Sequence, residues 1–86
     1  MTQSSILIYG SDWCGDCRRA RRFLERHQIP FEWIDIEKDK EAERVVKETN
    51  HGMRSIPTIF FSDGTILVEP SNAELARKLN IEIAPI

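Results

Sequence analysis

Two cysteines, Cys14 and Cys17, lie in the stretch SDWCGDC at a C-x-x-C spacing, and they are both of the cysteines in the chain. A pair at this spacing serves as a redox centre, as half of a metal site or as a structural disulfide. A structural zinc site needs four ligands, and the remaining candidates, His27 and His51, are far from a metal-binding spacing. A permanent disulfide would close a loop of only a few residues and would stabilise the fold little. We therefore expect a redox pair.

The elements around the pair strengthen this interpretation. Residues 5–9 are apolar and β-rich, as in a buried strand that ends at Gly10-Ser11-Asp12. A helical spacing of apolar residues then runs from about Cys14 and stops before Pro30. Unpaired N–H groups and the positive end of the helix dipole at Cys14 favour the anionic thiolate, which is the nucleophile of disulfide exchange. Cys17 follows one turn later on the same side of the helix, within disulfide reach.

The remaining segments predict an α/β fold. We expect further strands at residues 31–36, 58–61 and 66–69, and helices at 38–50 and 71–79. Asp63-Gly64 is a strong hairpin signal, and Ser71 with Glu74 forms a capping box. The order is β-α-β-α-β-β-α, and its first strand–helix–strand unit requires a parallel pair of strands. The isoleucines of residues 81–86 suggest that this segment also packs.

Length and composition describe an ordinary globular protein. At 86 residues the chain is expected to form one domain, residues 1–86. A net charge of −2 gives no reason to expect nucleic acid or an acidic membrane as a partner. The first residues lack the basic region of a signal peptide, and no apolar run is long enough to span a membrane. We expect a cytoplasmic monomer.

A second motif, Ser55-Ile56-Pro57-Thr58, opens the third predicted strand. Proline is tolerated at a first strand position because it has no ladder donor to lose there. Alternatively, a cis peptide bond at Pro57 would present the backbone of Ile56 to an extended substrate near Cys14. X-Pro bonds are cis in only about 5–6% of cases in folded proteins, so the sequence physics leaves both readings open.

With WCGDC after the first strand and SIPT before the third, the chain resembles the glutaredoxin branch of the thioredoxin superfamily. The segments DIEKDKEAERVV and RSIPTIFFSDGTILVEPSNAELARKL are similar to mycoredoxin-like glutaredoxins, which reduce mixed disulfides of mycothiol. The resemblance implies a thioredoxin fold with a four-stranded mixed sheet and three helices. It also implies a thiol–disulfide oxidoreductase that reduces mixed disulfides between proteins and a low-molecular-weight thiol. Mycothiol or glutathione would be the co-substrate, with no metal and no tightly bound cofactor.

The resemblance assigns roles to individual residues. It makes Cys14 the nucleophile and Cys17 the resolving thiol. It places Pro57 at the cis-proline position and makes Ile56 the residue whose backbone pairs with the substrate. Trp13 flanks the nucleophile, either as part of the substrate site or as surface packing over the active-site loop.

Several positions depart from glutathione-type glutaredoxins. Asp16 stands where a tyrosine is common, so we treat it as a candidate substrate-binding residue; at a helix start it could also simply cap. Tyr9-Gly10-Ser11 lacks the lysine that often precedes the motif, and Glu69-Pro70-Ser71-Asn72 replaces a Gly-Gly-Cys-Asp-like element. The absence of this lysine and of the Gly-Gly-Cys-Asp-like element weakens the case for glutathione as the co-substrate.

A dense run of arginines follows the motif between residues 18 and 26. One interpretation is a solvated helix face whose long stems cover the core. The other is that Arg18 or Arg21 offsets the charge of Asp16 or meets an anionic substrate. Between Glu37 and Glu48 the charges alternate in sign, as on an exposed, ion-paired helix face.

Two other functions remain open within the resemblance. One is a thioredoxin-like dithiol electron donor reduced by a flavin reductase, although the Trp-Ser-Gly-Phe element of that group is absent. The other is an iron–sulfur cluster-binding glutaredoxin, a dimer that holds the cluster through Cys14 and an external thiol. The second cysteine disfavours this function.

Overall fold

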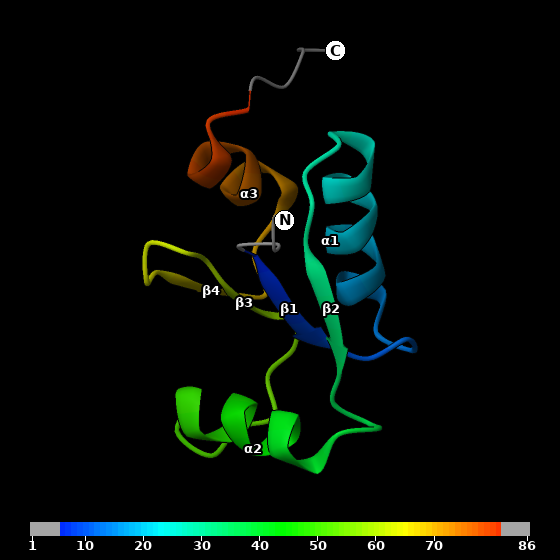
Figure 1. Cartoon of the computed structure of the whole chain (residues 1–86), viewed down its shortest axis with the longest axis vertical. Coiled ribbons are helices and arrows are strands. Elements are labelled where there is room, and N and C mark those ends of the chain that lie inside the picture. The colour runs from blue at the N-terminus through cyan, green and yellow to red at the C-terminus, as the bar shows by residue number, and fades with distance from the viewer. Residues whose placement is uncertain (1–5, 82–86) are drawn as a thin grey trace, which may run out of the picture.

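A mixed sheet with helices on both faces makes up the fold of residues 6–81, which are the residues that the computed structural model describes (Figure 1). The strands are β1 (Leu7–Gly10), β2 (Glu32–Asp35), β3 (Thr58–Phe60) and β4 (Ile66–Val68). The helices are α1 (Gly15–Arg26), α2 (Lys40–Thr49) and α3 (Asn72–Leu79). The predicted order of strands and helices is confirmed.

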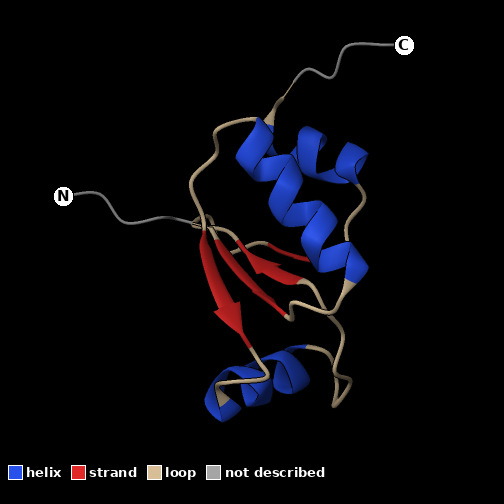
Figure 2. Ribbon diagram, turned by 90° about the vertical axis from the view of Figure 1, so that its right-hand side faces the viewer, coloured by secondary structure: helices blue, strands red, loops and turns tan. Residues whose placement is uncertain are grey.

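The sheet has the strand order β2-β1-β3-β4. β1 is parallel to β2, as the intervening helix requires, and β3 is antiparallel to both β1 and β4. Figure 2 shows α1 and α3 on one face of the sheet and α2 on the other. This is the thioredoxin fold, in agreement with the sequence-based expectation.

Two clusters of buried side chains fill the space between the helices and the sheet. The larger cluster joins α1 and α3 to the sheet, and its members are Ile6, Ile8, Ala20, Phe23, Leu24, Ile59, Phe61, Leu75 and Ala76. The smaller cluster joins α2 to the motif, and its members are Cys14, Cys17, Ile36, Ala42, Val46 and Ile56. Trp33 packs against both clusters. The cysteine pair is therefore part of the hydrophobic core.

The ends of the elements differ from the predicted ends in instructive ways. Gly10 was expected to break the first strand, but it is the last residue of β1, where it pairs with Asp35 and its carbonyl accepts from the Ile36 N–H at 2.9 Å. α2 begins at Lys40 rather than residue 38, because the Asp39 side chain accepts hydrogen bonds from the first turn and caps the helix.

Other local predictions are confirmed. The capping box of Ser71 and Glu74 opens α3, and β3 and β4 form the hairpin around Asp63-Gly64. Ile81 packs against the larger core cluster. The prediction for residues 82–86, and that for Ser5 in the first strand, lie outside the described residues. None of the helices within residues 6–81 has the length and apolar character that a membrane crossing requires.

Candidate active site

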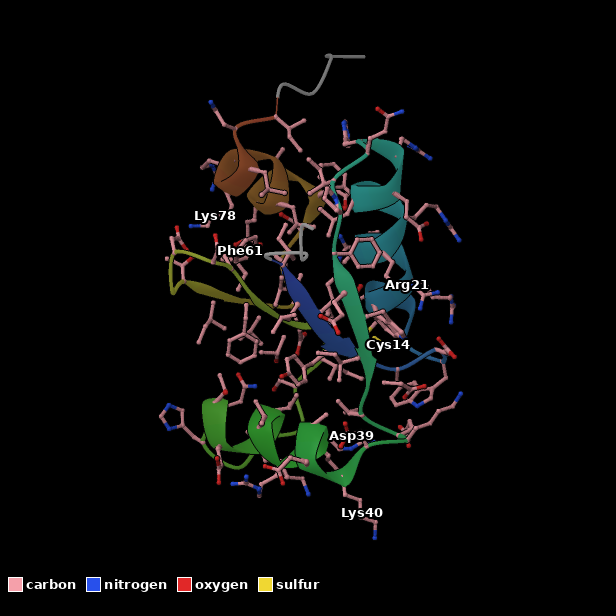
Figure 3. The ribbon with its side chains drawn as sticks, viewed as in Figure 1. Cys14, Arg21, Asp39, Lys40, Phe61 and Lys78 are labelled. Atoms are coloured by element: carbon pink, nitrogen blue, oxygen red, sulfur yellow. The ribbon has the colours of Figure 1, made fainter. Side chains whose placement is uncertain are left out.

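Cys14 lies where β1 has ended and α1 begins (Figure 3). It is the N-cap residue of α1, and its sulfur accepts a hydrogen bond from the backbone N–H of Cys17 at 3.2 Å. Here a sulfur takes the place of the usual Ser, Thr, Asp or Asn oxygen as the cap, and the N–H of Cys17 points at it. Such donors stabilise a thiolate more than a neutral thiol. Only 8% of Cys14 is exposed, so the residue offers little surface to a partner.

Cys17 lies one turn further into α1 and is fully buried, and both cysteines are free thiols in this structure. Burial, followed by the hydrogen bond with Cys14, raises the pKa of Cys17 from its ordinary value of 9.0 to about 12. At neutral pH Cys17 is thus a neutral thiol. The two cysteines are chemically unequal, as a nucleophile and a second, protonated thiol would be.

Ile56 and Pro57 stand directly beside the first cysteine. The Cys14 sulfur lies 3.9 Å from the carbonyl oxygen of Ile56, and the Ile56–Pro57 peptide bond is cis. Of the two readings of the SIPT motif, the structure has the cis proline next to the thiol. Thr58 then begins β3, where it pairs with Tyr9 at the end of the sheet that carries the motif.

Trp13 precedes Cys14 and is 64% exposed, yet its indole is fixed. Its Nε1–H donates to the Glu37 carboxylate at 2.8 Å, and Arg54 donates to the same oxygen at 2.7 Å. Arg54 also donates to Glu43 at 2.7 Å. Hydrogen bonds from Arg54 and then Trp13 hold the pKa of Glu37 below its usual range. This network joins the loop before Cys14 to the loop before Ile56.

Asp16 lies in the first turn of α1 and is exposed. Its ion-pair partner is Arg19, at 3.5 Å, so neither Arg18 nor Arg21, the two arginines considered for offsetting its charge, pairs with it. Residues three apart on a helix are neighbours, which favours Arg19 geometrically. Arg18 instead donates to the Asp12 carbonyl at 2.8 Å, and Arg21 pairs with the Asp12 carboxylate at 3.3 Å.

The sequence analysis assigned no role at the site to two residues near Cys17, namely Gly10 and Trp33. A β-carbon on Gly10 would lie 2.7 Å from the Cys17 sulfur and 2.8 Å from Cη2 of Trp33. Real β-carbons do not approach other atoms this closely, so the sulfur and the indole occupy the volume that a side chain would need. Glycine inside a strand often marks such a close approach, and this signal was present in the sequence. The position of Trp33 depends on how β2 pairs with β1, so it could not be predicted from the sequence.

The sequence had left a metal half-site as one use of the cysteines. Within residues 6–81 no group of three or more histidine, cysteine, aspartate and glutamate side chains is arranged to hold a metal ion. His27 instead ends α1, where its ring lies 4.5 Å from that of Phe23.

Comparison with known proteins places the chain among redox proteins. A family model described as glutaredoxin matches residues 6–66. The chain is 37% identical to putative glutaredoxin Rv3198A of Mycobacterium tuberculosis over 79 residues, which cover 92% of this chain and 94% of that protein. It is 38% identical to Mycoredoxin 1 of Corynebacterium glutamicum over 76 residues, which cover 88% of this chain and 94% of that protein.

A solved structure agrees with these sequence matches. The crystal structure of a glutaredoxin from Archaeoglobus fulgidus superposes with a TM-score of 0.72 at 26% identity, and the match covers 90% of this chain and 87% of that one. The similarity therefore extends over the strands and helices that carry the cysteine pair.

Proposed function

Because the chain belongs to the glutaredoxin family, whose members are disulfide oxidoreductases, we propose that it reduces mixed disulfides between proteins and a low-molecular-weight thiol. Cys14 is the nucleophile of this proposal. The observation that carries it is the placement of the Cys14 sulfur at the N-cap of α1, 3.2 Å from the N–H of Cys17 and 3.9 Å from the Ile56 carbonyl.

The proposed reaction begins at the sulfur of the small thiol. The Cys14 thiolate attacks that sulfur, the disulfide bond to the protein breaks, and the protein leaves as a thiolate that takes up a proton. The small thiol is now bound to Cys14. In one route a second molecule of small thiol attacks the bound one, so that a disulfide of two small thiols leaves and Cys14 returns as a thiolate. In the other route the Cys17 thiolate attacks the Cys14 sulfur, which frees the small thiol and leaves a Cys14–Cys17 disulfide. Each of these disulfides then needs external reduction.

The substrate site of this proposal surrounds Cys14. The backbone of Ile56, held by the cis bond to Pro57, lines one side of the sulfur, and Trp13 offers an exposed apolar ring on the adjoining loop. Asp16 lies on the first turn of α1, where its charge would be felt by an approaching anion. Mycothiol and glutathione are the two candidate small thiols, and we expect the chain to act as a monomer.

Substitution of each cysteine tests the assignment. We expect Cys14→Ser to abolish the reduction of a protein mixed disulfide, because no nucleophile remains. Cys17→Ser is expected to retain a fraction of the activity, because a second small thiol can still resolve the intermediate. The measurement is release of the small thiol from a model protein, with mycothiol, glutathione and a thioredoxin reductase supplied in parallel. Equal and complete loss in both variants would contradict the use of an external resolving thiol.

The parallel arms also separate the alternatives. Turnover with the reductase alone would favour a dithiol electron donor and contradict the proposal. An anaerobically purified protein with strong visible absorption would favour a cluster-binding glutaredoxin, since a dithiol does not absorb there. The expected result is turnover with one of the small thiols and a colourless protein.

A further inference from the structure

A groove between α1 and α3 is lined by arginine side chains. Its volume is about 200 Å³, and its lining residues are Arg19, Arg22, Phe23, Arg26 and Asn72. Figure 2 shows the two helices on the same face of the sheet. Phe23 belongs to the larger core cluster and is only 7% exposed, so it gives the groove an apolar floor. We call this cavity the arginine groove.

The periodicity of α1 places the three arginines in one row. Arg19, Arg22 and Arg26 follow one another at spacings of three and four residues, which puts them on the same side of the helix. The first residue of α3, Asn72, lines the groove from the other helix. One wall of the groove is therefore cationic along its whole length.

Arg19 joins the two walls of the arginine groove. Its guanidinium donates to the side chain of Asn72 at 2.8 Å and to the carbonyl of Pro70 at 3.0 Å. It also pairs with the carboxylate of Asp16 at 3.5 Å. The hydrogen-bonding capacity of Arg19 is thus largely used within the chain, and its contribution is to hold α1 against the start of α3.

The backbone before α3 connects the groove to the active site. The N–H of Glu69 donates to the carbonyl of Pro57, the cis proline, at 2.8 Å. From this end the groove follows α1. At a rise of about 1.5 Å per residue, Arg22 and Arg26 lie about 12 Å and 18 Å along the helix axis from Cys14. An extended peptide covers such a distance with about four to six residues.

The outer two arginines of the groove are available to a partner. Arg22 and Arg26 are exposed. Within residues 6–81 no ion pair involves either guanidinium, and no hydrogen bond of the described side chains does so. Both charges are solvated in the free protein, so a bound carboxylate would not have to displace an existing partner.

Charge is distributed unevenly over the chain. α1 holds five arginines and two acidic residues, which gives it a net charge of +3. The rest of the chain holds seven basic and twelve acidic residues, which gives it a net charge of −5. The arginine groove is therefore a basic surface on an otherwise acidic molecule. Such a separation attracts an acidic partner to the basic surface and repels it elsewhere.

We propose that the arginine groove binds an acidic segment of the protein partner, about four to six residues from its disulfide-bonded cysteine, through Arg22 and Arg26. The inference rests on the proposed function and adds a class of protein substrate to it, namely proteins with clustered aspartate or glutamate near the reacting cysteine. A guanidinium pairs with a carboxylate through two parallel hydrogen bonds. The apolar floor at Phe23 suits the methylene groups of such side chains.

Paired peptides test this docking. Each peptide carries one cysteine in a mixed disulfide with mercaptoethanol, which is uncharged. The acidic peptide has a cluster of glutamates about four to six residues from the cysteine, and its partner has glutamines in their place. A second pair has the cluster on the other side of the cysteine, because a bound chain can run in either direction. Acid quenching and mass spectrometry give the second-order rate constant at which the full-length reduced protein releases each peptide thiol.

The expected result for the wild-type protein is a preference for the acidic peptide in one of the two pairs. An exposed ion pair changes a binding constant by a factor of about 1.4 to 5, so two of them predict a preference of about threefold to tenfold. The preference should shrink in about 1 M salt, where the screening length falls to about 3 Å.

Substitution of the outer arginines ties the preference to the groove. The double variant Arg22→Gln, Arg26→Gln should lose it. The matched control Lys40→Gln, Lys47→Gln removes the same charge from exposed positions on α2, on the opposite face of the sheet, and should keep it. The ratio of the two rate constants cancels any effect of a substitution on Cys14 itself. If the double variant does not fold, Arg22→Gln alone decides, with a reduced preference expected.

The other outcomes overturn the proposal in distinguishable ways. Equal rates for both peptides of each pair in the wild-type protein overturn the docking and leave the proposed function standing. A preference that survives in the double variant, or an equal slowing of both peptides there, also overturns it. A dimer at the assay concentration that the double variant dissociates would assign the groove to a second copy of this chain. If the wild-type protein releases no thiol from any peptide, the proposed function fails, and the inference with it.

Discussion

The two thiols of this chain have different surroundings, although both lie at the start of α1. The Cys14 sulfur receives a helix N–H, whereas the Cys17 sulfur is buried against Gly10 and Trp33. Donors favour a thiolate and burial opposes it. A sulfur that accepts a helix N–H and a fully buried, protonated thiol thus lie three residues apart.

The raised pKa of Cys17 predicts a pH dependence of stability for the reduced protein. Unfolded Cys17 loses its proton near 9.0, while the folded residue keeps it until about 12. The folded state therefore binds more protons in this window, and the free energy of unfolding should fall as the pH rises above 9.0. The limiting slope for one group is about 1.4 kcal/mol per pH unit. Urea unfolding under reducing conditions measures this loss.

Cys17→Ala is the matched variant for this experiment. It removes the thiol and leaves Tyr9, whose pKa burial also raises, in place in both proteins. The difference between the two stability curves therefore reports Cys17 together with its interaction with Cys14. Parallel curves above pH 9 would mean that Cys17 titrates as it does in the unfolded chain.

At the scale of elements, helix caps position the site. Cys14 caps α1, Asp39 caps α2 and Ser71 caps α3. The helix starts at Cys14 and Ser71 were predicted from the sequence, because a capping side chain and the N–H groups that donate to it are close in sequence. The start of α2 was placed two residues early, since Lys38 is also a good helix former and only the geometry of Asp39 distinguishes the two.

Removal of the Asp39 cap should weaken the α2 side of the core. Asp39→Ala leaves the N–H groups of Glu41 and Ala42 without their acceptor, and we expect a loss of about 1 kcal/mol in the free energy of unfolding. Asp39→Ser keeps an acceptor and should retain most of it. Denaturant unfolding of the three proteins tests this, and an equal loss in both variants would show that the cap is not the cause.

At the scale of the molecule, side-chain contacts between distant segments join the elements into one site. Trp13, Glu37 and Arg54 link two loops around Cys14, and Arg19 links α1 to the start of α3. The arginine run is thus more than a solvated face. Arg19 and Arg21 have fixed partners, while exposed stems such as that of Arg22 fit the simpler interpretation.

The link made by Arg19 predicts a difference between neighbouring arginines. Its guanidinium donates to the Asn72 side chain at 2.8 Å and to the Pro70 carbonyl at 3.0 Å. We expect Arg19→Ala to cost about 1–2 kcal/mol of unfolding free energy, because two charge-assisted hydrogen bonds of a partly exposed group are lost. Arg22→Ala, on the same helix but exposed, should change it by about 0.5 kcal/mol or less. Equal effects of the two substitutions would contradict the link.

The sequence by itself determined the order of elements and the helix start at the cysteines, but it left open whether the proline of the SIPT motif lies beside a thiol. Hydrophobic periodicity, helix capping and C-x-x-C spacing involve residues that are close in the chain, so these patterns can be recognised in the sequence without knowledge of the fold. The tertiary structure alone decided that the Ile56–Pro57 bond is cis, that Arg54 and Trp13 share Glu37, and that the Cys17 sulfur and the Trp33 indole fill the volume beside Gly10. These features depend on the register of β1 with β2 and on loops that meet only in the folded chain. The local pattern places the thiols at the start of a helix, and long-range packing sets the surroundings of each one.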